Sequence, residues 1–180
     1  VPLTFTRNPP VLSKLYDKWQ LKRTVARLHR KEKFSFTHCR SYVAAEAGME
    51  LFKNSGIPFL FDMRGFWVDE RVDNGQWDLK KPFFKWAYKL YKKKERQYLA
   101  QSTHIISLTQ KGKEELITTF KVPGNKISVI PCCADLQHFN YKKIKPEAIE
   151  NLKKELQISP ETKVLSYLGS LGGWYLLDEM

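Results

Sequence analysis

Three segments of the chain, which begin at His38, Asp62 and Gly169, carry ionisable residues or glycines in patterns that suit an anionic or hydroxyl-rich ligand. The guanidinium of Arg64 can neutralise a phosphate through a planar pair of N–H donors, although it cannot act as a base. The glycine-rich segment 169–173 can present backbone N–H groups to a phosphate at the start of a following helix. The candidates for ligand binding are polar or small residues of these segments: His38, Arg40, Asp62, Gly65, Asp69, Glu70, Gly169, Ser170 and Gly172.

Each candidate also has a purely structural interpretation. Arg64 could form a salt bridge with Asp62 or Asp69, and the carboxylates could simply neutralise Arg64 and Arg71. A lone histidine at a strand end, such as His38, is more often a packed or capping residue than a ligand. A glycine loop is a weak signal by itself. Both interpretations stay open at this point.

The candidates must be positioned by the elements around them, and hydrophobic periodicity predicts an alternation of helices and strands. Apolar residues at helical spacing from Leu12 to Trp19 predict an amphipathic helix. Pro82 suits the first position of a long helix, and Thr109 is a fair N-cap for another. The predicted helices cover about residues 12–31, 41–54, 82–100 and 111–120, and the predicted strands cover 34–37, 57–61, 104–108, 127–130 and 163–168.

Strands separated by helices indicate right-handed βαβ units. The predicted class is therefore α/β, with a Rossmann-like, mostly parallel sheet and helices on both faces. We expect residues 34–130 to supply four parallel strands. Such sheets bind ligands at the carboxyl ends of their strands, where the candidate residues lie. If the strand 34–37 is an exposed edge, we also expect oligomer contacts there, because exposed edges tend to pair.

Composition excludes several classes of protein. The chain of 180 residues is 42% hydrophobic, which argues for a packed core and against disorder. No apolar run approaches the about 20 residues that a membrane span needs, and nothing at the start resembles a signal peptide. The three cysteines, Cys39, Cys132 and Cys133, lack the spacing of metal ligands or of a disulfide framework. We therefore expect buried, inert thiols, no bound metal and a cytoplasmic location.

The net charge of +12 indicates an anionic partner or substrate. Basic residues concentrate in the predicted helices 12–31 and 82–100, but no DNA or RNA recognition motif accompanies them, so we expect no nucleic acid. A basic face of helix 82–100 would suit the inner surface of an anionic membrane. A solvated face that merely aids solubility is the alternative. The residues expected to point outward are Lys81, Lys85, Lys89, Lys92, Lys93 and Arg96.

Four runs of sequence, in a fixed order, resemble the glycosyltransferases of family 4. The resemblance covers most of the chain from about His38 onward. It implies a GT-B fold, with residues 1–140 as an N-terminal Rossmann-like domain that lacks its first strands. Residues 141–180 would then be a linker and the first strand, loop and helix start of the C-terminal domain. The four runs are GIPFLFDMRGFWVDE, IISLTQKGKEEL, ISVIPCCADLQHF and YLGSLGGWYLLDE.

The resemblance also implies an activity. Family members transfer a sugar from a nucleotide-sugar donor to an acceptor such as a glycan or a lipid-linked molecule, as in polysaccharide biosynthesis. Retention of configuration and independence of metals and other cofactors are further implications. Arg64, the candidate catalytic residue, stands where many members place a histidine near the reacting sugar. His38 and Arg40 match a run that lines the acceptor side of the cleft.

The chain departs from the family pattern at two points. Cys132 and Cys133 replace the usual Asn and Gly of the signature that closes the N-terminal domain. The paired glutamates that contact the donor in family members do not occur before Met180. The segment itself is therefore expected to be inactive. The alternative function is a non-catalytic basic α/β module that binds an anionic membrane or nucleic acid.

Overall fold

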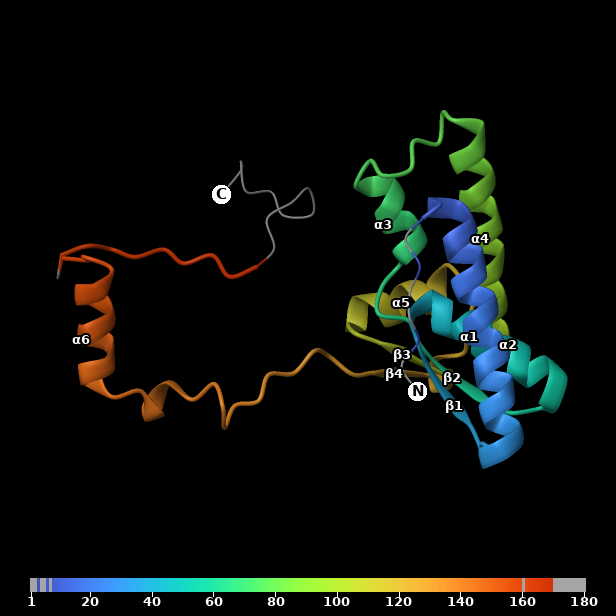
Figure 1. Ribbon diagram of the computed structural model, residues 1–180, viewed down its shortest axis with the longest axis horizontal. Coiled ribbons are helices and arrows are strands. Elements are labelled where there is room, and N and C mark those ends of the chain that lie inside the picture. Colours follow the sequence, from blue (N-terminus) through green and yellow to red (C-terminus); the bar gives the residue numbers. More distant parts are fainter. Residues whose placement is uncertain (1–2, 4–5, 7, 160, 170–180) are drawn as a thin grey trace. The chain divides into compact units, whose positions relative to one another are not determined.

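Four parallel strands form a sheet in the order β1-β2-β3-β4 (Figure 1). In this computed structural model, residues 3, 6, 8–159 and 161–169 are described. Adjacent strands pair directly, with Arg40 opposite Asp62 and Asp62 opposite Ile106. The arrangement confirms the α/β, Rossmann-like class and the four parallel strands expected between residues 34 and 130. The strands are β1 (Thr37–Arg40), β2 (Phe59–Asp62), β3 (His104–Ser107) and β4 (Ile127–Val129).

Helices connect the strands, and local sequence signals fix several of their ends. Pro10 and Pro82 occupy first-turn positions, where the missing N–H is not needed. Gly56 ends a helix in the left-handed conformation with φ 69°. Thr109 accepts a hydrogen bond from the Gly112 N–H at 2.9 Å, as expected of an N-cap. The helices are α1 (Pro10–Glu32), α2 (Ser41–Ser55), α3 (Trp67–Asp73), α4 (Pro82–Gln101) and α5 (Gln110–Thr118), and a short 3-10 helix covers Gly124–Lys126.

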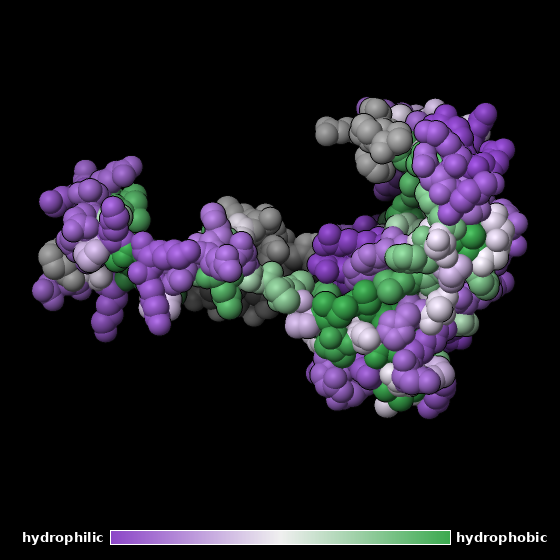
Figure 2. All heavy atoms as spheres, turned by 90° about the horizontal axis from the view of Figure 1, so that it is seen from below, coloured by the Kyte–Doolittle hydropathy of each residue, from purple (hydrophilic) through white to green (hydrophobic). Residues whose placement is uncertain are grey.

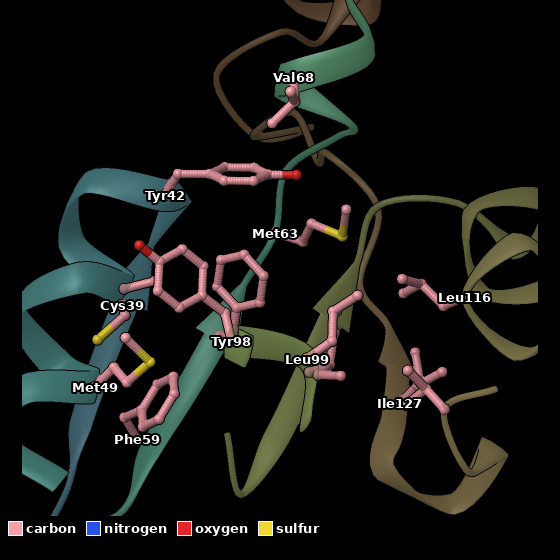
Figure 3. Close-up of a cluster of buried hydrophobic side chains, with 14 residues drawn as sticks. Cys39, Tyr42, Met49, Phe59, Met63, Val68, Tyr98, Leu99, Leu116 and Ile127 are labelled. Atoms are coloured by element: carbon pink, nitrogen blue, oxygen red, sulfur yellow. The ribbon is translucent and has the colours of Figure 1, made fainter. Parts of the chain in front are cut away.

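The core lies between one face of the sheet and helices α2, α4 and α5 (Figure 3). A row of paired strand residues points into it and is buried: Cys39, Phe61, Ile105 and Ile127. Aromatic edge contacts join Phe61 to Tyr42 of α2 and Tyr98 of α4, with ring centroids 5.7 and 5.6 Å apart. The opposite face carries Leu60 and Ile106, which the described residues cover only in part. Helices over that second face stay a prediction.

Helix α2 approaches β1 closely at Gly48, where a Cβ would overlap Cys39 Sγ and lie 3.4 Å from Phe59 Cβ. We therefore expect Gly48→Ala to lower the free energy of unfolding by about 1–3 kcal/mol, the usual effect of overpacking. Urea denaturation measures the change. Cys39→Ala removes the clashing sulfur, so Gly48→Ala should be less destabilising in that background. Equal losses in both backgrounds would contradict the steric explanation.

A half-buried carboxylate joins three helices. Glu46 of α2 forms ion pairs with Lys18 and Lys22 of α1 at 3.2 and 3.0 Å, and with Lys94 of α4 at 2.9 Å. Burial by itself would raise the pKa of Glu46, but the three lysines outweigh it and lower the pKa to about 2. The depressed pKa means that the folded state binds this proton less readily than the unfolded chain.

This cluster should make stability depend on pH. The contribution of Glu46 is present above the unfolded pKa of about 4.3 and is lost as the pH falls toward 2. Allowing for solvent screening of the lysines, we expect Glu46→Gln to lower the free energy of unfolding by on the order of 2 kcal/mol at neutral pH. The difference from the wild type should vanish near pH 2. A difference that stays constant from pH 7 to pH 2 would contradict the assignment.

Two predicted features of the first part of the chain are wrong. The strand expected at 34–37 begins at Thr37, because the Thr37 N–H donates to the Pro58 carbonyl at 2.9 Å and pairing with β2 starts there. The Phe34 N–H instead donates to His29 Nδ1 at 3.1 Å at the end of α1. Residues 67–73, which belong to none of the predicted helices or strands, form helix α3. Partner strands thus determine where a strand begins, which local periodicity does not show.

Helix α1 forms as predicted, but its apolar stripe of Leu12, Leu15, Tyr16 and Trp19 is exposed. The helix instead contacts α2 and α4 through polar side chains, among them Lys18, whose Nζ donates to Tyr91 Oη at 2.8 Å. Among the described residues, no helix is both long and apolar enough to cross a bilayer.

The structure divides the chain into two compact units, Val1–Pro131 and Cys132–Met180, so residues 132–140 fall in the second. The second unit contains a 3-10 helix, Tyr141–Lys143, and helix α6 (Pro146–Glu155). Apolar residues gather on one side of α6 and hydrophilic residues on the other (Figure 2). The apolar side includes Ile149 and Leu152, which are exposed.

Two expectations for the second unit are wrong. Residues 163–168 form no strand, because a strand needs a neighbour for its backbone hydrogen bonds and the described residues of this unit provide none. Cys132 and Cys133 are exposed, because their segment of the second unit belongs to no helix or strand, whereas Cys39 in the first unit is buried as expected.

Candidate functional site

The carboxyl ends of β1 and β2 bring three of the predicted site residues together. Arg40 pairs with Asp62 across the two strands, and His38 Nε2 lies 3.4 Å from Asp62 Oδ2. Asp62 is buried, and its other oxygen, Oδ1, has no hydrogen-bond partner among the described residues. His38 and Arg40 are exposed on the same face of the sheet. The Asp62 carboxylate thus has an oxygen that can accept a hydrogen bond, and the exposed side chains of His38 and Arg40 can donate hydrogen bonds beside it. This arrangement is suited to bind a polar ligand.

The backbone is strained at the same two strand ends. Among the described residues, five non-glycine residues have a positive φ, and three of these, Lys33, Lys121 and Gln157, lie within three residues after a helix C-terminus, where this conformation is common. The other two are Ser41, after β1 with φ 67°, and Arg64, after β2 with φ 64°. Such a conformation costs about 1–2 kcal/mol per residue and often occurs at functional sites. The strained residues therefore lie at the strand ends where the candidate site residues occur.

Gly65 follows Arg64 with φ 157°, and a Cβ there would overlap the carboxylate of Glu70. The Glu70 side chain folds back over the start of its own helix, α3, and accepts a hydrogen bond from the Phe66 N–H. Burial nevertheless raises the pKa of Glu70. Gly65 and Glu70 therefore shape the turn after β2, whatever else they bind.

Asp69 is held by helix α4 rather than by an arginine. Its Oδ1 accepts a hydrogen bond from Tyr88 Oη at 2.8 Å, and its Oδ2 pairs with Lys92 Nζ at 2.8 Å. Arg71 stacks on Trp67 at 4.4 Å and donates to Gln76 at 2.8 Å. The interpretation in which Asp69 neutralises Arg71 is therefore wrong.

Glu95 is a residue of the site region that sequence reasoning missed. It is fully buried, and its carboxylate accepts hydrogen bonds from Tyr42 Oη and Lys92 Nζ. Burial raises the pKa of both Glu95 and Tyr42. Tyr42 Oη also lies 3.5 Å from the Gly65 carbonyl. The network links α2 and α4 to the turn after β2. The sequence contains one indication of Glu95, because it is the single acidic residue within a strongly basic helix.

A groove opens beside this network, between α3, α4 and α5. Its volume is about 550 Å³. Asp69 and Glu70 lie on one side with Lys92 and Arg96 on the other, so the groove has both hydrogen-bond acceptors and donors. This lining suits a ligand rich in hydroxyl groups better than a bare phosphate. The lining residues are Phe66, Asp69, Glu70, Asp73, Tyr88, Lys92, Arg96, Glu115, Thr119 and Phe120.

The glycine-rich segment is separate from these residues along the chain. Gly169 is described and belongs to the second unit, while Ser170 and Gly172 lie outside the described residues. No group of His, Cys, Asp or Glu side chains that could hold a metal ion occurs in the part of the chain that the structure describes.

Comparison with known proteins identifies the family. Residues 2–138 match the model of Glycosyltransferase Family 4. The chain belongs to this family. The candidate residues at the carboxyl ends of β1 and β2 fall within the matched residues, as does the groove between α3, α4 and α5. The match confirms the resemblance seen in the sequence.

A solved structure shares the fold of this family 4 chain. The crystal structure of a glycosyltransferase from Rickettsia africae ESF-5 matches with a TM-score of 0.50 and 11% sequence identity. The match covers 89% of this chain and 36% of the other, so the family 4 chain spans about a third of the length of that protein. At this identity the likeness concerns the fold alone. Among curated proteins, none matches the chain.

Proposed function

We propose that this chain is the acceptor-side domain of a glycosyltransferase that moves a sugar from a nucleotide-sugar donor to a glycan or a lipid-linked acceptor. The family match over residues 2–138 is the observation that carries the proposal. Retention of configuration, a GT-B arrangement and a metal-independent reaction in the cytoplasm are part of the same proposal. Donor binding would also need a second domain.

The chemistry of the strand ends supports this function. Glycosyl transfer passes through an oxocarbenium-like transition state with a diphosphate leaving group, so it needs cations near phosphate and a positioned acceptor hydroxyl. Arg64, on its strained turn, would neutralise the leaving group or orient the acceptor. Asp62, with Oδ1 free of partners among the described residues, would accept a hydrogen bond from an acceptor hydroxyl. His38 and Arg40 would line the same side.

The groove would extend the acceptor site. Asp69 and Glu70 would bind further hydroxyl groups from its acidic side. Gly169, Ser170 and Gly172 would contact the donor phosphates through backbone N–H groups. No other cofactor takes part in this scheme.

The test uses the full-length gene product and a panel of nucleotide sugars. We expect one of them to release its nucleoside diphosphate in the presence of an acceptor, and the 180-residue segment alone to release none. Release that does not respond to Arg64→Ala would contradict the proposed site. An absence of turnover with every donor, together with steeply salt-dependent binding to nucleic acid, would favour the non-catalytic basic module instead.

Edge strand β1 pairs only with β2 among the described residues, which supports the proposed oligomer contact. The edge lies at Thr37–Arg40 rather than at residues 34–37. Sedimentation velocity over a range of concentrations tests it. Hydrogen exchange that protects this strand in a dilute monomer would count against it.

A further inference from the structure

Two aromatic side chains stand exposed in the first turns of α4. The side chains of Phe83 and Trp86 are 60% and 61% exposed, and their ring centroids lie 6.3 Å apart. Helix α4 buries a different face, with Tyr98 and Leu99 in the core. Single exposed apolar residues are common on protein surfaces, but a contiguous exposed pair indicates a contact site.

The same helix is strongly basic on the outside. Residues 80–101 contain eight lysines and arginines and one acid, Glu95, which is buried. Lys92 and Lys94 turn inward, to Asp69 and to Glu46, so the outward orientation expected for Lys92 is wrong. The basic residues of α4 and its N-cap that remain exposed are Lys81, Lys85, Lys89, Lys93 and Arg96.

The aromatic and basic residues occupy one face. Trp86, Lys89 and Lys93 are spaced by three and four residues, which places them on the same side of a helix. A groove of about 540 Å³ runs along this side, lined by Lys89, Lys93 and Arg96 among others. Lysines flanking a tryptophan and a phenylalanine are typical of helices that lie in a membrane interface, where aromatic rings sit at headgroup depth.

We infer that α4 docks on an anionic lipid bilayer, with Phe83 and Trp86 inserted among the headgroups and Lys85, Lys89 and Lys93 paired with lipid phosphates. Charge complementarity selects this partner, because every exposed charged side chain of α4 is cationic. The aromatic pair adds an apolar component that pairing of charges does not supply. Docking is therefore electrostatic and partly resistant to salt.

The position of α4 in the fold links docking to the candidate site. The chain leaves β2 at Asp62, passes through α3 and enters α4 at Pro82, so α4 begins beyond α3, on the side of the sheet where the strands end (Figure 1). Arg64 follows β2 on that side. This step rests on the proposed function: a docked α4 holds the acceptor side of the site close to the bilayer, which suits an acceptor carried by a lipid.

The experiment measures binding of the full chain to vesicles by sedimentation. Vesicles of phosphatidylglycerol mixed with phosphatidylcholine serve as the anionic probe and pure phosphatidylcholine as the neutral one. We expect binding to the anionic vesicles only. Replacing Lys85, Lys89 and Lys93 with Gln should weaken it by on the order of a hundredfold, at roughly fivefold for each charge.

The aromatic pair has its own readout. At about 1 M salt, where screening reduces the Debye length to about 3 Å, a residual fraction of the chain should stay bound. Phe83→Ala with Trp86→Ala should abolish that fraction, while Trp86→Phe should keep it. Brominated lipids should quench tryptophan fluorescence in the wild type, and Trp86→Phe should remove this component. Phe36→Ala is the matched control, since Phe36 is 64% exposed but lies at the amino end of β1.

The outcomes separate the inference from the proposed function. Binding that disappears completely in high salt, with no quenching of Trp86, would overturn insertion of the aromatic pair. Equal binding to both kinds of vesicle, or to neither, would overturn docking altogether, as would binding that requires nucleic acid or a second protein. Sugar transfer to a water-soluble acceptor is measured separately, so its failure bears on the proposed function and leaves the vesicle result standing.

Discussion

Replacing Arg64 with alanine in the full-length protein should lower turnover about tenfold to a thousandfold, the effect of losing one electrostatic partner of the transition state. The expectation follows from the position of Arg64 two residues after Asp62, on the turn that follows β2, with φ 64°. Arg64→Lys should recover only part of the activity, because an ammonium group lacks the planar pair of donors. Release of nucleoside diphosphate under saturating donor measures the effect.

Stability measurements separate a functional role from a structural one. Alanine and arginine have similar difficulty with a positive φ, so Arg64→Ala should change the melting temperature little. Arg64→Gly should be about 1 kcal/mol more stable than Arg64→Ala, because glycine adopts this conformation without strain. The turnover of Arg64→Gly should be as low as that of Arg64→Ala. Arg27→Ala, at an exposed position of α1, is the control. A large fall in melting temperature with unchanged turnover would show that Arg64 is structural.

Replacing Glu95 with alanine should lower the free energy of unfolding by about 3–5 kcal/mol, since it removes one partner of a buried polar network. The change leaves the buried Tyr42 hydroxyl without its acceptor and Lys92 with Asp69 as its remaining carboxylate. Glu95→Gln keeps an acceptor for Tyr42 and should lose less, about 1–3 kcal/mol. Urea denaturation at neutral pH measures both.

The pH dependence gives a second test of this network. Burial raises the pKa of Glu95, so its contribution to stability is greatest at low pH and declines as the pH rises through the folded-state pKa. The contribution of Glu95 to stability thus changes with pH in the opposite direction to that of Glu46. Glu114→Ala, at an exposed position of α5, should change stability by less than about 0.5 kcal/mol. A loss at Glu95 no larger than at Glu114 would show that the network contributes nothing.

Sequence by itself determined the order of the elements and therefore the class of fold. Alternating helical and strand periodicity predicted four parallel strands, because parallel neighbours require a crossover between them. The Thr109 cap and the Pro82 start follow from local chemistry and are confirmed. The meeting of His38, Arg40 and Asp62 was also predictable, since the carboxyl ends of adjacent parallel strands share one edge.

Only the tertiary structure decided which side chains are buried and with which partners. Glu95 meets Tyr42 across 53 residues of chain, and no local pattern specifies such a pair. The apolar stripe from Leu12 to Trp19 predicted a helix correctly but not its exposure, because periodicity reports the spacing of residues on a face and not what covers it. The positive φ of Arg64 is likewise set by the turn between β2 and α3 and not by its residue type, which usually avoids that conformation.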